Sequence, residues 1–332
     1  MKISLKNIAE ETGYSVSTVS RFLCGKRRYY NKKEKLIFKI ANKYNYPFIQ
    51  NFYNNGINLK VSLIMNIHKG EFFSSLLSDF HIAAKDSNCD IEIIDIKKKD
   101  FLEHKLESLI ENKDGLCILY PDLSKNECVK LESYTNKIPI LSLSPILESS
   151  INTITFDNYL GGYLAAKHLK DLGYKNAGII SGNDNLYEAY QRRNGFMDYL
   201  TSNNMDCKWE FKGNYSLECG HDAFRDFNRK NIKDIGIFGV NDNMCFGFMK
   251  LALLSGIKIP DSISIIGFDN TPFCENSIPE LTSISTDFID LGQKALTAIE
   301  KSFVDNNRTL GHSTNLLPVN LINRNSTMSV IK

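Results

Sequence analysis

No stretch of the sequence approaches the roughly 18 consecutive apolar residues that a membrane-spanning helix needs. The first residues, Met1–Leu5, lead into polar sequence, and the apolar core of a signal peptide is missing. The eight cysteines form no C-x-x-C pair and are scattered through apolar segments. We therefore expect a soluble cytoplasmic protein with buried free thiols, without disulfides or a zinc site.

The short motifs of the common enzyme classes are also missing. The chain contains no P-loop (G-x-x-x-x-G-K-[ST]), no G-x-G-x-x-G after an expected strand and no G-x-S-x-G nucleophile elbow. The six histidines show no H-E-x-x-H or other metal-ligand spacing. We therefore expect no enzymatic activity, no cofactor and no metal ion.

Charge is unevenly distributed along the 332 residues. Residues 1–60 contain 12 lysines and arginines against 3 acidic residues, a net charge of +9. The rest of the chain has 28 basic and 35 acidic residues, a net charge of −7. A basic head on an acidic body is typical of a polyanion-binding module attached to another domain. A solvated lysine-rich surface is the alternative.

Apolar residues near the N-terminus recur with a helical period. The three expected apolar faces are Leu5, Ile8 and Ala9; Val19, Phe22 and Leu23; and Leu36, Ile37, Ile40 and Ala41. Ser4, Ser15 and Asn31 can cap these helices, and Gly13 supplies the turn between the first two. Three short helices with one tight turn outline a helix-turn-helix unit.

From Val61 onward, short β-rich apolar runs alternate with helical stretches. The runs cover residues 61–67, 91–96, 115–120, 138–144, 152–156, 177–181, 235–240 and 263–268, with a helix expected over about 158–172. Such alternation predicts parallel sheets covered by helices on both faces. About 270 residues exceed one open sheet of ordinary size, so we expect two lobes with a cleft between them.

Polar side chains follow three of these runs. They are Asp157 and Asn158, then Asn241, Asp242 and Asn243, and finally Asp269 and Asn270. Ligands of open α/β sheets gather at the carboxyl ends of the strands. Amides and carboxylates suit the hydroxyls of a sugar, which both donate and accept hydrogen bonds. For Asp157 and Asp242, however, we expect the simpler role of capping the next helix.

The sequence of the first two helices is specific. SLKNIAEETGYSVSTVSRFL matches the pattern T-[IL]-x-D-[IV]-A-x-x-A-G-V-S-x-x-T-V-S-R-x-L. Further matches follow in order: INTITFDNYLGGYLAAKHLKDLGY, R-x-x-G-F at 192–196, VNDNMCFG at 240–247, SIIGFDNT at 264–271, IPELTSI at 278–284 and PVNLINRNS at 318–326. On these residues, the chain resembles the LacI/GalR (lactose-repressor/galactose-repressor) family of bacterial transcription regulators along nearly its whole length.

The resemblance implies an all-α helix-turn-helix headpiece and an α/β two-lobed core like that of periplasmic sugar-binding proteins, with two doubly wound parallel sheets. The headpiece would span residues 1–45, the hinge 46–59 and the effector-binding and dimerisation core 60–332. Within the core, the N-lobe would comprise about 60–157 and 288–318. The C-lobe would comprise about 158–287 and 319–330.

The resemblance also implies a homodimer that binds palindromic double-stranded operator DNA. The recognition helix would then start at about Val16 and end at Cys24. Three of its side chains would face base edges in the major groove: Val16, Ser17 and Arg21. Three others would contact phosphates or cap the helix: Ser15, Thr18 and Ser20. Arginine can donate two hydrogen bonds to guanine, and valine offers methyl contact with thymine, although any one serine is alternatively just solvated.

In the core, family positions that bind the small-molecule effector are occupied by a mixed polar and aromatic set. Those that contact sugar hydroxyls are Arg192, Asn241 and Asp269. The aromatic positions are Phe72, Phe73, Tyr215 and Phe288, of which Phe72 or Phe73 is alternatively plain core. Ser144 lies where many sugar-binding members carry an aspartate, which indicates a different ligand or a different binding geometry. Of Arg192 and Arg193, the motif register favours Arg192 as the binding residue.

The hinge departs from the family pattern. It reads YPFIQNFYNNG over 46–56, about two residues shorter than usual and without the leucine that wedges into the minor groove. Phe52 or Tyr53 is the candidate wedge, and Cys24 replaces an asparagine that usually follows the recognition helix. The end of the chain at Lys332, without a leucine-heptad tail, favours a dimer.

These features predict a sequence-specific transcriptional repressor whose operator binding is controlled by a sugar or sugar derivative. A sugar-binding sensor with a weakened or sequence-blind headpiece is the alternative. A third possibility is an α/β enzyme fused to a DNA-binding domain, which the lack of catalytic motifs disfavours.

Overall fold

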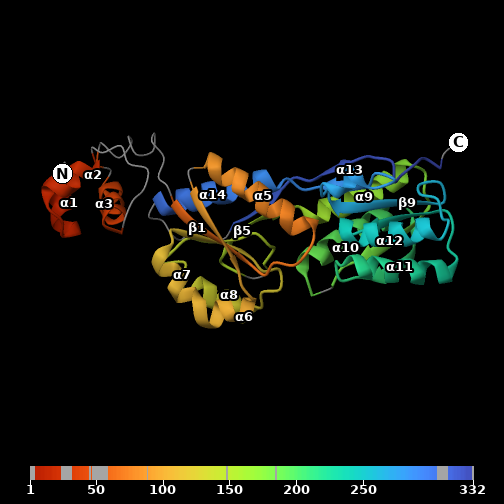
Figure 1. Cartoon of the computed structure of the whole chain (residues 1–332), viewed down its shortest axis with the longest axis horizontal. Helices are drawn as coiled ribbons and strands as arrows, with labels where there is room; N and C mark the ends of the chain where they lie inside the picture. Colours follow the sequence, from red (N-terminus) through yellow and green to blue (C-terminus); the bar gives the residue numbers. More distant parts are fainter. Residues whose placement is uncertain are drawn as a thin grey trace.

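A computed structural model of the chain describes residues 4–23, 32–44, 46, 59–87, 89–146, 149–183, 185–304 and 313–330. The three N-terminal helices lie at one end of an elongated molecule, and two α/β lobes follow along its long axis (Figure 1). The predicted cap Asn31, Cys24 and the candidate wedge residues Phe52 and Tyr53 lie outside the described ranges.

The headpiece contains α1 (Leu5–Thr12), α2 (Val16–Leu23) and α3 (Lys32–Lys43). Both predicted serine caps are confirmed: Ser4 occupies the N-cap of α1, and the Ser15 hydroxyl accepts a hydrogen bond from the Thr18 N–H at 3.2 Å. Gly13 ends α1 in the left-handed conformation, with φ of 72°. These features set the tight turn between α1 and α2.

The three helices share a small apolar core. Its buried members are Ile8, Ala9, Val19, Phe22, Leu23, Ile37, Phe38, Ile40 and Ala41. One predicted member is wrong, because Leu36 is 38% exposed. The buried face of α3 is centred on Ile37 and Ala41, and Leu36 lies about 100° around the helix from Ile37. On another side of α3, the Phe38 ring stacks at 6.4 Å on Phe303 of the core.

The N-lobe is built on a six-stranded, fully parallel sheet with the order β11-β5-β4-β3-β1-β2. Its strands are β1 (Leu59–Met65), β2 (Cys89–Asp95), β3 (Gly115–Leu119), β4 (Ile140–Ser142), β5 (Asn152–Phe156) and β11 (Thr314–Leu317). Its helices are α5 (Glu71–Asp86), α6 (Lys98–Asp100), the π-helix η2 (Phe101–Lys105), α7 (Leu106–Asn112), α8 (Lys125–Glu132) and α14 (Phe288–Val304). Figure 1 shows α5 and α14 on one face of the sheet and α6–α8 on the other.

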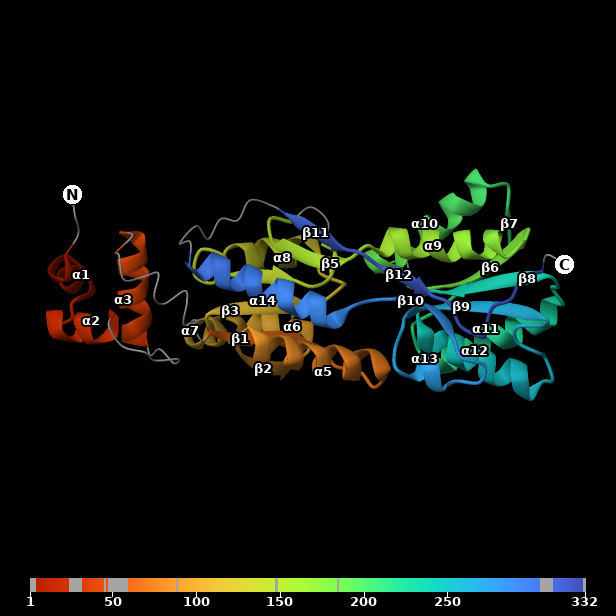
Figure 2. The same cartoon turned by 90° about the horizontal axis from the view of Figure 1, so that it is seen from above.

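The C-lobe has a second six-stranded sheet with the order β12-β10-β9-β8-β6-β7, parallel except for β12. Its strands are β6 (Asn176–Ser181), β7 (Asp206–Lys212), β8 (Ile235–Gly239), β9 (Ile263–Asp269), β10 (Thr282–Ser285) and β12 (Asn320–Ile322). Its helices are α9 (Asn158–Asp171), α10 (Tyr187–Ser202), α11 (Leu217–Lys230), α12 (Asp242–Leu254) and α13 (Phe273–Asn276). Helices α9 and α10 cover one face, and α11 and α12 cover the other (Figure 2).

The chain crosses between the lobes three times, after β5, after β10 and after β11. Strands β5 and β10 therefore end at the boundary between the lobes. Because Asp269 is paired with Ser285 at the end of β10, the carboxyl end of β9 lies at the same boundary. The fold thus brings polar residues from the ends of several strands to the junction, as expected for an open α/β sheet.

Seven cysteines fall within the described residues, and all seven are free thiols. Six are buried, in agreement with the sequence prediction, and Cys207 is half-buried. Burial raises the pKa of the Cys89 thiol from 9.0 to about 12, so this thiol stays protonated and unreactive at neutral pH. Among the described helices, none combines the length and the apolar character needed to cross a bilayer.

Candidate functional site

Helix α2 has one buried face and one polar face. Val19, Phe22 and Leu23 are packed into the headpiece core, whereas Val16 is 44% exposed. The predicted DNA-contacting residues lie mainly on the outer face: Ser15, Val16, Ser17, Thr18 and Arg21 are exposed, and Ser20 is half-buried. The helix therefore offers a surface of hydroxyls and one arginine to a partner, without loss of its own packing.

The hydroxyls at the start of α2 form a local network. Ser15 Oγ lies 3.0 Å from Ser17 Oγ and 2.8 Å from Thr18 Oγ1. Since Ser15 also accepts from the Thr18 N–H, its capping role is shown, while its predicted phosphate contact stays a prediction.

Arg192 is the centre of the polar site in the C-lobe. This buried side chain donates from Nε to Asn158 Oδ1 at 2.8 Å and from Nη1 to the Val240 carbonyl oxygen at 2.6 Å. Its guanidinium carbon lies 3.6 Å from the centre of the Phe268 ring, close enough for a cation–π interaction. Three contacts from three different elements hold the guanidinium in one position.

Close approach of two helices helps to fix Arg192. A Cβ atom at Gly162 of α9 would overlap the carbonyl oxygen of Arg192 on α10. A Cβ at Gly195 would overlap the carbonyl oxygen of Tyr159 on α9 in the same way. Only glycine fits at these two crossings, so α10 is held tightly against α9 beneath the site.

Asp269 ends β9 opposite Arg192. Its Oδ1 lies 3.5 Å from Arg192 Nη1, and the residue is only 5% exposed. Burial is the main cause that raises the pKa of Asp269 well above 3.8, and the neighbouring Arg192 guanidinium lowers it only in part. The φ angle of Asp269 is +106°, in a region that non-glycine residues rarely adopt. Backbone strain of this kind is concentrated at functional sites in proteins.

Several buried polar atoms of the two lobes have no hydrogen-bond partner among the described residues. They include Asp269 Oδ1, Tyr215 Oη, Asn270 Oδ1 and Ser144 Oγ. Buried polar atoms are normally paired, so each unpaired atom needs an explanation, such as a missing ligand or water. Three of these four residues were predicted from the sequence as effector contacts, and Asn270 follows Asp269 directly.

Asn241 and Tyr215 are linked at the start of α12. Asn241 caps this helix through a hydrogen bond that its Oδ1 accepts from the Met244 N–H at 3.1 Å. Its Nδ2 donates to the carbonyl oxygen of Tyr215 at 3.0 Å. Asn241 therefore orients the Tyr215 backbone, and its amide has limited capacity left for a ligand.

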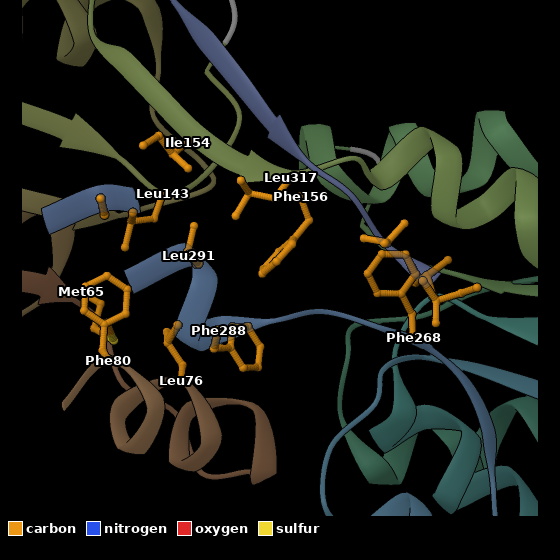
Figure 3. Close-up of a cluster of buried hydrophobic side chains, with 14 of the residues drawn as sticks. Met65, Leu76, Phe80, Leu143, Ile154, Phe156, Phe268, Phe288, Leu291 and Leu317 are labelled. Atoms are coloured by element: carbon orange, nitrogen blue, oxygen red, sulfur yellow. The ribbon is translucent and has the colours of Figure 1, made fainter. Parts of the chain in front are cut away.

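Three of the four predicted aromatic residues form one cluster in the N-lobe, whereas Tyr215 lies in the C-lobe. Phe72 packs edge-on against Phe73 and against Phe288, with 5.3 Å between ring centres in both pairs. Phe156 joins at 5.7 Å from Phe288. Figure 3 shows Phe156 and Phe288 on the N-lobe side and Phe268 across the junction. The cluster thus faces the lobe boundary from the side opposite Arg192.

Of the two aspartates predicted to cap helices, Asp157 does so and Asp242 does not. Asp157 caps α9 as expected, since its Oδ1 accepts from the Leu160 N–H at 2.9 Å. The prediction for Asp242 is wrong, because Asn241 is the cap of α12. Asp242 instead accepts hydrogen bonds that come from β10 and from the segment after β9. The donors are the Thr271 N–H at 2.8 Å, Thr271 Oγ1 at 3.2 Å, Cys274 Sγ at 3.2 Å and Ser283 Oγ at 2.6 Å.

Sequence reasoning missed two residues of the polar site, Phe268 and Glu188, and it named Asn158 only among the polar residues that follow strands. Phe268 lies under the Arg192 guanidinium, Asn158 holds its Nε, and Glu188 stands one helical turn before it on α10. Phe268 and Asn158 were visible as members of matched motifs, but only the fold brings them to Arg192. Arg193, the neighbour of Arg192, forms a pair of hydrogen bonds with Glu210 at 2.6 and 2.7 Å instead.

Comparison with known proteins gives the same picture along the whole chain. Residues 166–327 match the model of the periplasmic binding protein-like domain. The chain is 28% identical to the NTD biosynthesis operon regulator NtdR of Bacillus subtilis, over 98% of this chain and 99% of the relative. It is 26% identical to the lactose operon repressor of Escherichia coli, over 98% and 91%. The predicted resemblance to the LacI/GalR family is thereby confirmed.

A solved structure has the same fold in outline. The complex of the transcriptional regulator CelR with cellobiose has a TM-score of 0.73 at 16% identity, and the match covers 98% of this chain and 99% of that one. A likeness at this identity concerns the fold, and it includes both the helical headpiece and the two lobes. The predicted fold class, a helix-turn-helix headpiece on a periplasmic-binding-protein-like core, is thereby confirmed.

Proposed function

We propose that the protein is a sequence-specific DNA-binding transcriptional repressor whose operator binding is controlled by a sugar or sugar derivative. The observation that carries DNA binding is the outer face of α2, where Val16, Ser17 and Arg21 are exposed while the opposite face is packed. A helix of this kind fits the major groove, where arginine reads guanine. The relatives of the chain are named as operon regulators and repressors, which supports this role.

The effector would bind at the lobe boundary, between the Arg192–Asp269 pair and the aromatic cluster of Phe72, Phe73 and Phe288. The unpaired oxygens of Ser144, Tyr215 and Asp269 are available to pair with a ligand's polar groups, and aromatic rings pack on the apolar faces of a sugar. The related fold of CelR was solved with a sugar, cellobiose. Closure of the two lobes on the ligand would shift the headpieces relative to each other and so change operator affinity.

A homodimer is part of the proposal. Operator half-sites of a helix-turn-helix protein match the two-fold symmetry of the protein, so two headpieces are needed. The C-lobe exposes Leu254 (75%) and Ile278 (86%), large apolar side chains that a second copy would cover. As a regulator of transcription the protein would act in the cytoplasm and would not be an enzyme.

The experiment is a fluorescence titration of the protein against DNA from upstream of its own gene, at two salt concentrations. We expect specific binding with a steep salt dependence. The variant Arg21→Ala should bind the specific site about 10- to 100-fold more weakly, because one arginine–guanine contact contributes roughly 1–3 kcal/mol. Arg225→Ala, an exposed arginine of α11, is the matched control.

Salt-sensitive binding without preference for any sequence would contradict the repressor and favour a sugar sensor with a sequence-blind headpiece. Phe52→Ala and Tyr53→Ala test the proposed wedge in the same titration. Unchanged operator affinity and bending in both variants would exclude a wedge at these residues.

A further inference from the structure

Glu188 is a carboxylate of the C-lobe that the structure leaves without a partner. It lies in the first turn of α10, four residues before Arg192, so both side chains leave the same face of the helix. The side chain is half-buried, and within the described residues it forms no hydrogen bond or ion pair. A half-buried carboxylate that accepts no hydrogen bond is costly to keep, which indicates that something else pairs with it.

Asp269 provides an independent observation at the same place. This carboxylate is more than nine-tenths buried, and its Oδ1 has no hydrogen-bond partner. The nearby guanidinium of Arg192, at 3.5 Å, already donates two N–H groups to the neutral oxygens of Asn158 and Val240. Within the described residues, Arg192 donates no hydrogen bond to Asp269 Oδ1 or to Glu188.

Glu188 is within electrostatic reach of the other site residues. Its charge is among the causes that raise the pKa of Asp269 and the pKa of the Tyr215 hydroxyl, after burial of each group. The pKa of Glu188 itself is raised by burial and is lowered only by Arg192. Glu188 is therefore near enough to Asp269 and Tyr215 to act on both, and Asp242 is a further carboxylate that raises the pKa of Asp269.

The charge balance of this region selects the ligand. In their ionised forms, the carboxylates of Glu188 and Asp269 exceed the single guanidinium by one negative charge when a ligand excludes water, and the nearby Asp242 carboxylate adds no cation. A neutral sugar would satisfy hydrogen bonds but would leave that charge desolvated, which is unfavourable. An ammonium group adds one positive charge and three donors, enough for the Glu188 carboxylate, Asp269 Oδ1 and Tyr215 Oη.

We propose that Glu188 binds an ammonium group of the effector, and that the effector is a hydroxylated amine of the amino-sugar class. The proposal rests on the function proposed above, in which a sugar-like effector binds at the lobe boundary. It adds that the specificity of this protein depends on a carboxylate of α10. Arg192 then holds Asp269 in place, and Glu188 distinguishes an amine from a hydroxyl.

The test measures binding by isothermal titration calorimetry and thermal shift for three matched probes: glucosamine, N-acetylglucosamine and glucose, with the galactose series in parallel. N-acetylation removes the charge and keeps the ring. For the wild-type protein we expect an amine to bind at least 10-fold more tightly than its N-acetyl and hydroxyl counterparts. Glu188→Gln should reduce amine affinity at least 10-fold and remove the preference, while its melting temperature without ligand stays unchanged or rises.

Glu218→Gln is the matched control, since Glu218 also lies in the first turn of a C-lobe helix but is exposed. It should retain the wild-type preference. Equal or tighter binding of neutral sugars by the wild-type protein, or an unchanged preference in Glu188→Gln, would overturn the ammonium proposal and leave the sugar-controlled repressor standing. If no probe binds, amine or neutral, both the amino-sugar proposal and the sugar part of the proposed function fail.

Discussion

The guanidinium of Arg192 stacks on the ring of Phe268, with 3.6 Å between the guanidinium carbon and the ring centre. Phe268 precedes Asp269 in β9, so one strand supplies both the ring beneath the arginine and the carboxylate beside it. The planar guanidinium can stack and donate hydrogen bonds at once, which an ammonium cannot do. This geometry makes arginine specifically necessary at position 192.

Arg192→Lys should therefore lose both stability and effector affinity. Lysine cannot reach Asn158 Oδ1 and the Val240 carbonyl oxygen together, and each buried acceptor left unpaired costs about 1–3 kcal/mol. Urea denaturation would measure the loss. Arg193→Lys is the control, because Arg193 pairs with Glu210 in a partly exposed position, where such pairs contribute about 1 kcal/mol or less. Equal effects of the two variants would contradict the role assigned to Arg192.

Replacement of Asp242 by asparagine should destabilise the protein, because the amide keeps only one acceptor oxygen. In Asp242→Asn, an amide NH₂ would face either the Ser283 hydroxyl or the Thr271 N–H, both of which now donate to a carboxylate. We expect a loss of about 1–3 kcal/mol in the free energy of unfolding at pH 5. Asp261→Asn, at an exposed position in the same lobe, should change stability by less than about 0.5 kcal/mol. Wild-type stability of Asp242→Asn would show that the network contributes little.

The pH dependence of stability gives a further test of Asp242. Burial raises its pKa from 3.8 to about 6, although four hydrogen bonds oppose the shift. The folded state therefore binds more protons than the unfolded state between pH 4 and 6, and this contribution to stability is lost as the pH rises through about 6. The difference in unfolding free energy between the wild-type protein and Asp242→Asn should decrease from pH 4 to pH 7. An increase over this range would mean that the folded state prefers the ionised carboxylate.

At the two glycines where α9 and α10 cross, addition of a single methyl group should lower stability markedly. Gly162→Ala would place a Cβ against the Arg192 carbonyl oxygen, and Gly195→Ala would do the same against Tyr159. Since backbone atoms cannot rotate away, the helices must separate, at a cost of about 1–3 kcal/mol. Thermal unfolding would measure the loss, and effector affinity should fall with it because Arg192 lies at the crossing. Thr201→Ala, exposed on α10, is the control, and a comparable loss in this variant would undermine the explanation.

The sequence was sufficient for features that depend on local patterns. The strand over 152–156 and the helix from Asn158 match the structure closely, because apolar runs and a capping aspartate mark them. β7 was missed, since Asp206, Lys208, Glu210 and Lys212 interrupt its apolar pattern. This strand lies at the edge of the sheet, where one face needs no burial.

Features that depend on long-range contacts could not be predicted. The Arg192–Asn158 hydrogen bond joins residues 34 positions apart, and the network of Asp242 reaches Ser283, 41 positions away. Local propensity gave Asp242 a capping role that the preceding Asn241 fills instead. The predicted site residues Arg192 and Asp269 were found through motif register, whereas Glu188 became visible only when the fold placed it beside them.

Two valines of the same helix provide the sharpest test of the headpiece. Val19 is fully buried and Val16 is 44% exposed, although the two are only three positions apart on α2. Val19→Ala should destabilise the headpiece by about 1–3 kcal/mol, because it leaves a cavity between the helices. Val16→Ala should leave the unfolding free energy within about 0.5 kcal/mol of wild type, yet weaken binding to the specific operator by removing methyl contact with a thymine. Circular dichroism during denaturation and operator titration separate the two effects. If Val16→Ala leaves operator affinity unchanged, then this part of α2 does not face the bases.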